Sequence, residues 1–205
     1  MATKAKAGRR PSKDSPDASG LLVLELQGIH SAENQLSRVL PRLAKAVKSQ
    51  KLAGMLDQRL EQGERLIKDI ESVFDEMDES PGRKKNIAAE GLINDAREHM
   101  QEIEAGPALD AVLIGAIQKT EHYCIAAWGT ARSLAEAVGQ KTAGKAMERA
   151  LKEGAPFDEQ LTQIAEQEIT PALLSGESDD NESDSGNDAR ARPQRGEKSE
   201  QRAGR

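Results

Sequence analysis

The longest regular feature of this sequence is an apolar stripe that runs through residues 107–138. Its members recur at alternating steps of three and four residues, which is the spacing of one face of an α-helix. They are Ile114, Ile117, Glu121, Cys124, Trp128, Ala131, Ala135 and Val138. The stripe predicts a long helix packed against other helices, with the carboxylate of Glu121 directed into the core. A buried carboxylate is costly unless a donor, a cation or a metal ion pairs with it.

The same spacing occurs in three other long stretches, at residues 21–49, 52–77 and 142–164. The first stripe is Leu22, Leu26, Ile29, Glu33, Leu36, Leu40, Leu43 and Val47. The second is Leu52, Leu56, Leu60, Gly63, Ile67, Ile70, Phe74 and Met77. The third is Ala143, Met147, Ala150, Gly154, Phe157, Leu161 and Ile164. Glu33 is the one charged member of these three stripes, so it forms a pair of inward acids with Glu121.

The remaining helix is shorter, and the turns around it are marked by glycine and proline. We expect it at residues 86–104, with the side chain of Asn86 as its cap. Gly106-Pro107 separates it from the helix that carries Glu121, and Gly139 ends that helix. Aromatic residues make up only 2% of the chain, and its apolar residues are mainly Leu, Ile and Ala, which favours helices over strands. The sequence therefore predicts an all-α fold, a four-helix bundle with an extra shorter crossover helix.

The two ends of the chain have the composition of disordered tails. Residues 1–19 are basic and contain no apolar cluster, and residues 173–205 hold an acidic block, 177–188, followed by a basic block, 190–205. We therefore expect one helical domain at residues 20–172 between two disordered tails.

Composition also limits location and partners. No run of about eighteen apolar residues is present, so no membrane span is expected. The first twenty residues lack the apolar core of a secretory signal, and a single cysteine is compatible with a reducing cytoplasm. We expect a cytoplasmic protein. The net charge of -6 and the scarcity of aromatic residues disfavour nucleic acid as a partner, although the Arg-rich ends keep that interpretation open.

Two interpretations of Glu33 and Glu121 follow from the spacing. Glutamates that project into a bundle from facing helices build di-iron and di-manganese sites. Alternatively, the two acids are satisfied by Arg, Lys or Tyr side chains. Cys124 lies one turn after Glu121 and is either a thiolate ligand for a softer metal or a small buried hydrophobe. His30, one turn before Glu33, either joins the site or hydrogen-bonds near the surface.

Several segments, taken in order, resemble the YciE/YciF-type ferritin-like proteins, a bacterial stress-associated family. They are Ser-Ala-Glu-Asn-Gln-Leu at 31–36, Leu-Pro-Arg-Leu-Ala-Lys-Ala at 40–46, Glu-Gly-Leu-Ile at 90–93, Gln-Lys-Thr-Glu-His-Tyr at 118–123 and Ala-Trp-Gly-Thr at 127–130. The resemblance covers residues 21–168. It implies a ferritin-like bundle, usually a homodimer, with a di-metal centre. Glu33, Glu90 and Glu121 match the family's acidic pattern, and Glu153 matches it in part.

The departures from that family pattern fall on expected ligand positions. Cys124 stands where the family usually has Glu, Gln62 stands where Glu is frequent, and Leu66 replaces a frequent His or Gln. Gly154 follows Glu153 where the family commonly has an acidic pair. A di-iron bundle site uses about six protein ligands, four of them carboxylates, so these losses leave too few.

The resemblance and the departures from it therefore imply a stress-associated bundle that is non-catalytic and has a degraded di-metal site, with no cofactor or with weakly bound iron or manganese. The alternative is a di-iron or di-manganese carboxylate protein that handles iron or peroxide. In that case Glu33, Glu90 and Glu121 are the ligands, and His30, Cys124 or Glu153 complete the set. A homodimer is expected in either case, and an unidentified protein partner remains open.

Overall fold

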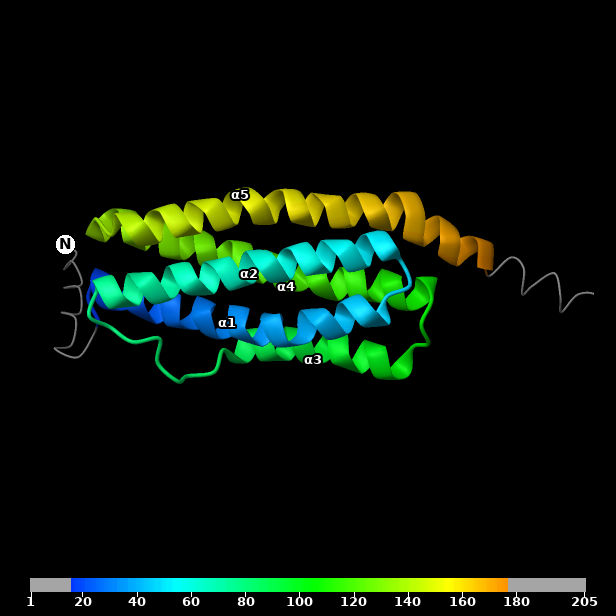
Figure 1. Cartoon of the computed structure of the whole chain (residues 1–205), viewed down its shortest axis with the longest axis horizontal. Coiled ribbons are helices and arrows are strands. Elements are labelled where there is room, and N and C mark those ends of the chain that lie inside the picture. Colours follow the sequence, from blue (N-terminus) through cyan, green and yellow to red (C-terminus); the bar gives the residue numbers. More distant parts are fainter. Residues whose placement is uncertain (1–15, 177–205) are drawn as a thin grey trace, which may run out of the picture.

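Four long amphipathic helices lie side by side, and a fifth, shorter helix packs on their outside (Figure 1). The computed structural model describes residues 16–176, so the tails expected at either end fall mostly outside the described part. The helices are α1 (Ala18–Ala46), α2 (Gln50–Glu76), α3 (Ile87–Glu102), α4 (Pro107–Val138) and α5 (Lys141–Ile164). The predicted all-α bundle is confirmed, with α3 as the crossover helix against α1 and α4.

The stripes predicted for three of the long helices are the faces that form the core. Every stripe residue of α1 and α5 is buried, and in α4 all are buried except Val138, which is half-buried. The stripe predicted for α2 is partly wrong, because Leu60, Ile67 and Met77 are only half-buried. The buried side of α2 passes instead through Arg59 and Leu66. An arginine at a core position was not expected, because its charge must be paired to be buried.

The bundle extends slightly beyond the predicted limits of 20 and 172. α1 begins at Ala18 because the side chain of Asp17 accepts a hydrogen bond from Gly20 N at 2.9 Å and caps the first turn. After α5 the chain forms a π-helical segment, η1 (Ala165–Ile169), and helical turns continue to residue 176. None of the helices within residues 16–176 is long and apolar enough to cross a membrane.

Two side chains fix the helix connections. Asp110, which is 1% exposed, accepts hydrogen bonds from Lys48 N and Ser49 N, both at 2.8 Å, and so holds the turn between α1 and α2 against α4. Asn86 caps α3 as predicted, accepting from Ala89 N at 3.0 Å.

Asn86 also ties α3 to two long helices. Its amide group donates to Gly28 O of α1 at 2.9 Å and to the Tyr123 hydroxyl of α4 at 2.5 Å, while its backbone N–H donates to Ser31 Oγ at 2.9 Å. These bonds fix how α1 and α4 lie against α3. Because Glu33 is on α1 and Glu121 is on α4, Asn86 helps to set their relative position.

Candidate functional site

The two inward glutamates meet at one point in the core, and an arginine lies between them. Glu33 of α1 is 1% exposed, Glu121 of α4 is 2% exposed, and Arg59 of α2 is 2% exposed. The guanidinium donates through Nη1 and Nη2 to the two oxygens of Glu33, both at 3.1 Å. Its Nε donates to Glu121 Oε2 at 2.8 Å. We call Glu33, Arg59 and Glu121 the buried triad.

The geometry of the triad suits an arginine in particular. The planar guanidinium presents donors in a fixed fork, which matches the two oxygens of one carboxylate, and Nε remains free for a second carboxylate. The ring of Trp128 lies with its centroid 5.5 Å from Arg59 Cζ, so the cation also faces an aromatic ring. A lysine offers a single compact point charge and lacks this planar fork.

Burial and charge act in opposite directions on the triad. Burial disfavours the charged form of Arg59, but the Glu33 and Glu121 carboxylates outweigh it and hold the pKa of the guanidinium well above its usual value. For Glu121, burial is the largest effect and raises its pKa, and the attraction of Arg59 does not cancel that rise. Glu121 Oε1 is buried without a hydrogen-bond partner among the described residues, which agrees with a disfavoured carboxylate.

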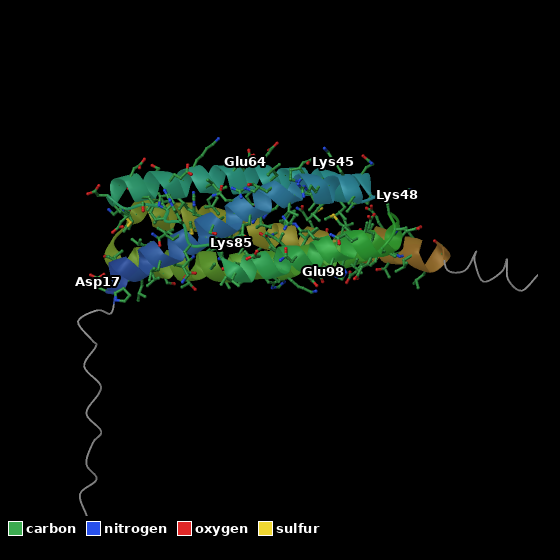
Figure 2. The ribbon with its side chains drawn as sticks, turned by 90° about the horizontal axis from the view of Figure 1, so that it is seen from below. Asp17, Lys45, Lys48, Glu64, Lys85 and Glu98 are labelled. Atoms are coloured by element: carbon green, nitrogen blue, oxygen red, sulfur yellow. The ribbon has the colours of Figure 1, made fainter. Side chains whose placement is uncertain are left out.

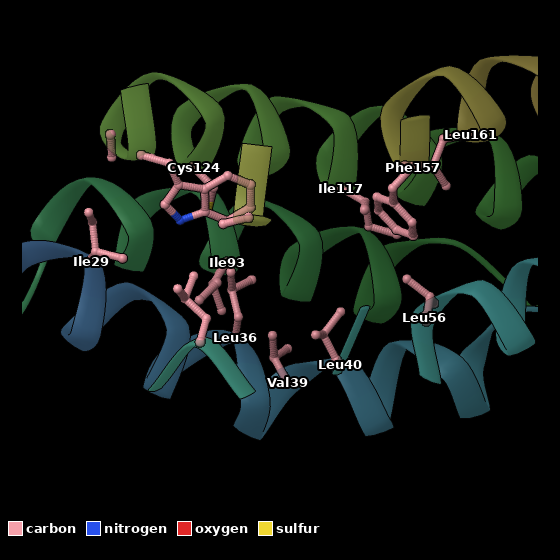
Figure 3. Close-up of a cluster of buried hydrophobic side chains, with 14 of the residues drawn as sticks. Ile29, Leu36, Val39, Leu40, Leu56, Ile93, Ile117, Cys124, Phe157 and Leu161 are labelled. Carbon is pink, nitrogen blue, oxygen red and sulfur yellow. The ribbon is translucent and has the colours of Figure 1, made fainter. Parts of the chain in front are cut away.

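Cys124 lies beside the triad but behaves as part of the apolar core. It is 3% exposed, and Figure 3 shows it in the cluster of buried hydrophobic side chains that also includes Ile29 of α1 and Ile93 of α3. Burial raises the pKa of its thiol well above the usual value, and the nearby Glu33 charge raises it further. The thiol is therefore held neutral, which corresponds to the interpretation of Cys124 as a small hydrophobe rather than a thiolate ligand.

Two glycines provide the space in which the triad fits. A Cβ atom at Gly63 would lie 2.8 Å from Glu33 Oε2 and 3.1 Å from Arg59 Nη1. A Cβ atom at Gly154 would lie 2.6 Å from Trp128 Cζ3 and 2.7 Å from Glu121 Oε1. Gly154 is one of the positions where the family resemblance implies an acid, and the absence of a side chain there leaves the space that Trp128 and Glu121 occupy.

The other predicted ligands are not joined to the triad. Glu90 pairs with Lys85 near the start of α3. Glu153 forms an ion pair with Arg65 at 3.3 Å between Nη2 and Oε2. His30 Nε2 lies 3.0 Å from Glu71 Oε1.

Of the predicted ligands, only Glu33 and Glu121 are hydrogen-bonded to a common partner, which is Arg59. Within residues 16–176 no group of three or more His, Cys, Asp or Glu side chains is arranged to hold a metal ion. The residues present do not fit a di-metal centre, because the Arg59 guanidinium lies where a cation shared by Glu33 and Glu121 would have to lie.

Arg59 is the site residue that sequence reasoning missed. A signal for it existed, because Leu56, Arg59 and Gly63 follow the same three-and-four spacing as the rest of the α2 face. Leu60 is adjacent and apolar, which made it the apparent stripe member.

Comparison with known proteins places these features in a family. The model of the family described as "Domain of unknown function (DUF892)" matches residues 17–174. Protein YciF of Escherichia coli strain K12 is 39% identical over 141 residues, which cover 68% of this chain and 85% of that protein.

Two solved structures resemble the bundle. The crystal structure of the E. coli stress protein YciF matches with a TM-score of 0.72 and 35% identity, covering 76% of this chain and 99% of that one. YcfI from Rhodopseudomonas palustris, which is described as a proposed structural protein, matches with a TM-score of 0.70 and 29% identity, and its coverage is 76% of this chain and 99% of its own. The match over residues 17–174 and the identity to YciF show that this chain belongs to the DUF892 family, the family of the E. coli stress protein YciF.

Proposed function

We propose that this protein is a stress-associated helical bundle that acts without catalysis, as a scaffold or binding module. The observation that carries the proposal is the buried triad, in which the cation that pairs Glu33 with Glu121 is a side chain of α2. An arginine supplies positive charge but no open coordination position, no redox change and no activated water. The centre of the bundle is therefore built for holding helices together rather than for metal chemistry.

The similarity to other family members supports the stress association. The E. coli relative is called a stress protein, and the R. palustris relative is described as a proposed structural protein. A non-catalytic role agrees with both descriptions. We also propose that the protein is cytoplasmic and forms a homodimer. Light scattering of the purified full chain would measure its oligomeric state.

An assay of iron and peroxide turnover tests the absence of catalysis. The full chain is incubated with ferrous iron and either oxygen or hydrogen peroxide, and iron oxidation is followed by absorbance. We expect the same rate as in buffer, and the same rate for the double variant Glu33→Gln with Glu121→Gln. A faster rate that disappears in the double variant would contradict the proposal and favour the iron- or peroxide-handling alternative.

A further inference from the structure

The C-terminal half of α1 carries an exposed basic surface. We call it the α1 basic face and define it as Arg38, Arg42, Lys45 and Lys48, all of which are exposed. The first three recur at steps of four and three, so they share one side of the helix. Residues 34–56 contain no Asp or Glu. The face therefore consists of like charges with no local compensation, which repel one another.

The structure gives these four side chains no carboxylate partner within residues 16–176, whereas several other exposed cations have one. Lys51 pairs with Glu168, Arg65 with Glu153 and Arg149 with Asp69. The negative end of the α1 dipole stabilises Lys45 in the last turn, but the effect fades within one turn and does not reach Arg38. The cations of the α1 basic face thus form no ion pair with a carboxylate in the described part of the chain.

The chain itself carries the missing negative charge directly after the described helices. Residues 177–188 contain no Lys or Arg, and half of them are acidic: Glu177, Asp179, Asp180, Glu182, Asp184 and Asp188. This segment follows the helix that projects from the end of the bundle where part of the α1 basic face lies. Lys45 and Lys48 lie at the end from which the C-terminal helix projects (Figure 2). The ion pair between Lys51 and Glu168 places that helix beside the turn between α1 and α2.

The length of the segment is sufficient for it to turn back. From residue 168 to residue 176 the helix advances about 12 Å. An extended segment of twelve residues spans up to about 40 Å. The extended segment is therefore about three times as long as the advance of the helix, which leaves length for it to turn back toward the α1 basic face. The exposed cations Arg83 and Lys84, in the connection between α2 and α3, belong to the opposite half of the bundle.

We infer that residues 177–188 dock on the α1 basic face of the same chain. The contact is electrostatic, with acidic side chains lying against the guanidinium and ammonium groups of α1. Docking removes the repulsion along α1 and covers a surface that would otherwise attract other polyanions. The face and the segment both lie outside the buried triad, so this inference is independent of the proposed function.

Zero-length cross-linking of the full chain with a carbodiimide tests the contact, because the reagent joins a carboxylate to a lysine amine only when the two touch. At low salt we expect cross-links from Lys45 or Lys48 to carboxylates of residues 177–188, identified by mass spectrometry. Salt at about 0.5 M should suppress them, because screening shortens the reach of exposed charges.

A charge-reversed variant and a matched control locate the contact. Arg38→Glu with Arg42→Glu keeps both lysines as reporters, and the cross-link yield should fall on the order of tenfold as two attractive contacts become repulsive. Arg83→Glu with Lys84→Glu makes the same charge change on the other half of the bundle and should leave the yield unchanged.

A second variant leaves every described residue intact. Asp179→Asn, Asp180→Asn and Asp184→Asn together halve the charge of the segment, and Glu177, Glu182 and Asp188 remain as reporters. The yield of links from these three remaining carboxylates to Lys45 and Lys48 should fall here too.

Three results would overturn the inference. One is an unchanged yield in the two charge-changing variants of the face and the segment. Another is cross-linking of the acidic segment to Lys198 instead of α1, which would show that the tail pairs with its own basic block. The third is a cross-link between a nitrogen-15-labelled chain and an unlabelled chain in a mixture of both. Such a link would show that the segment docks on a second copy of the chain.

Discussion

At the scale of single residues, Arg59 determines what the two inward glutamates do. Both carboxylates are in the core, where each requires compensation. The positions of Glu33 and Glu121 could be predicted from the sequence, because helical periodicity places them on apolar stripes. The partner could not, because it comes from α2 and only the packing of three helices brings it between them. The spacing left open both a metal site and a side-chain partner for the two acids, and the contacts of Arg59 correspond to the second interpretation.

Removing the arginine should be far more damaging than removing an exposed one. Arg59→Ala leaves two buried carboxylates unpaired, which costs about 3–5 kcal/mol of unfolding free energy. Arg65→Ala breaks the exposed ion pair with Glu153 and should cost less than about 1 kcal/mol. Urea denaturation of both variants at neutral pH measures the difference. Equal and small losses would show that Arg59 does not hold the core together.

The raised pKa of Glu121 gives a second prediction at this scale. Because the folded state raises this pKa, the folded chain holds the proton more tightly than the unfolded chain. The associated stability is complete below the ordinary glutamate pKa of about 4.3 and is lost as pH rises through the higher folded pKa. Glu121→Gln cannot titrate, yet its amide oxygen can still accept from Arg59 Nε.

The unfolding free energy of the Glu121→Gln variant relative to the unmodified protein should therefore increase as pH rises through that window. Denaturation series between about pH 4 and pH 8 measure the two curves. Parallel curves would mean that Glu121 has the same proton affinity in the folded and unfolded chains.

At the scale of the helices, the apolar stripes predicted the buried faces of α1, α4 and α5 better than that of α2. The buried faces of α1 and α5 are apolar apart from Glu33, and the stripe of α4 is apolar apart from Glu121, so periodicity identified them correctly. In α2 the buried face includes Arg59, Gln62 and Gly63, and its polarity hid it from a pattern based on apolar residues. Leu60 and Ile67 were therefore assigned to the stripe in place of Arg59 and Leu66, whereas Leu52, Leu56, Gly63, Ile70 and Phe74 are buried as predicted. The helix that holds the key side chain was thus the one whose face was predicted least well.

The close packing of α5 on α4 predicts opposite effects for two glycine substitutions. Glycine within a helix is less stabilising than alanine by about 1 kcal/mol, so Gly129→Ala should stabilise the protein, since nothing lies within 4 Å of the new Cβ. Gly154→Ala should destabilise it, because the same change places a Cβ atom 2.6 Å from Trp128 and 2.7 Å from Glu121 Oε1. Thermal unfolding of the two variants compares them, and stabilisation by both would show that α5 has room to move away from the triad.

The attachment of α3 depends on Asn86. Asn86→Ala removes the cap of α3 and its bonds to Gly28 and Tyr123, so the loss of unfolding free energy should be about 2 kcal/mol or more. Asn94→Ala, on the exposed side of the same helix, should change stability by less than about 0.5 kcal/mol. Hydrogen exchange of α3 amides locates the effect, and unchanged protection in the Asn86 variant would contradict this role.

At the scale of the whole molecule, the bundle has kept the architecture of its family while its centre differs from the expected di-metal pattern. Cys124 replaces one expected ligand beside the triad, and Gly154 replaces another. Gly154 has no side chain, which leaves the space occupied by Trp128 and Glu121. An acid at position 154 would collide with the side chains of Trp128 and Glu121. In this chain the inward carboxylates anchor α1 and α4 to Arg59 of α2.

The most direct test of this account is the metal content of the purified full chain after anaerobic loading with ferrous or manganous ions. Glu33→Ala and Glu121→Ala are measured beside it. If Arg59 has taken the place of the metal, the chain should bind well below about one metal ion, and neither variant should change that value. Binding of about two metal ions per chain, lost in both variants, would contradict the account and show that Glu33 and Glu121 form a working di-metal site.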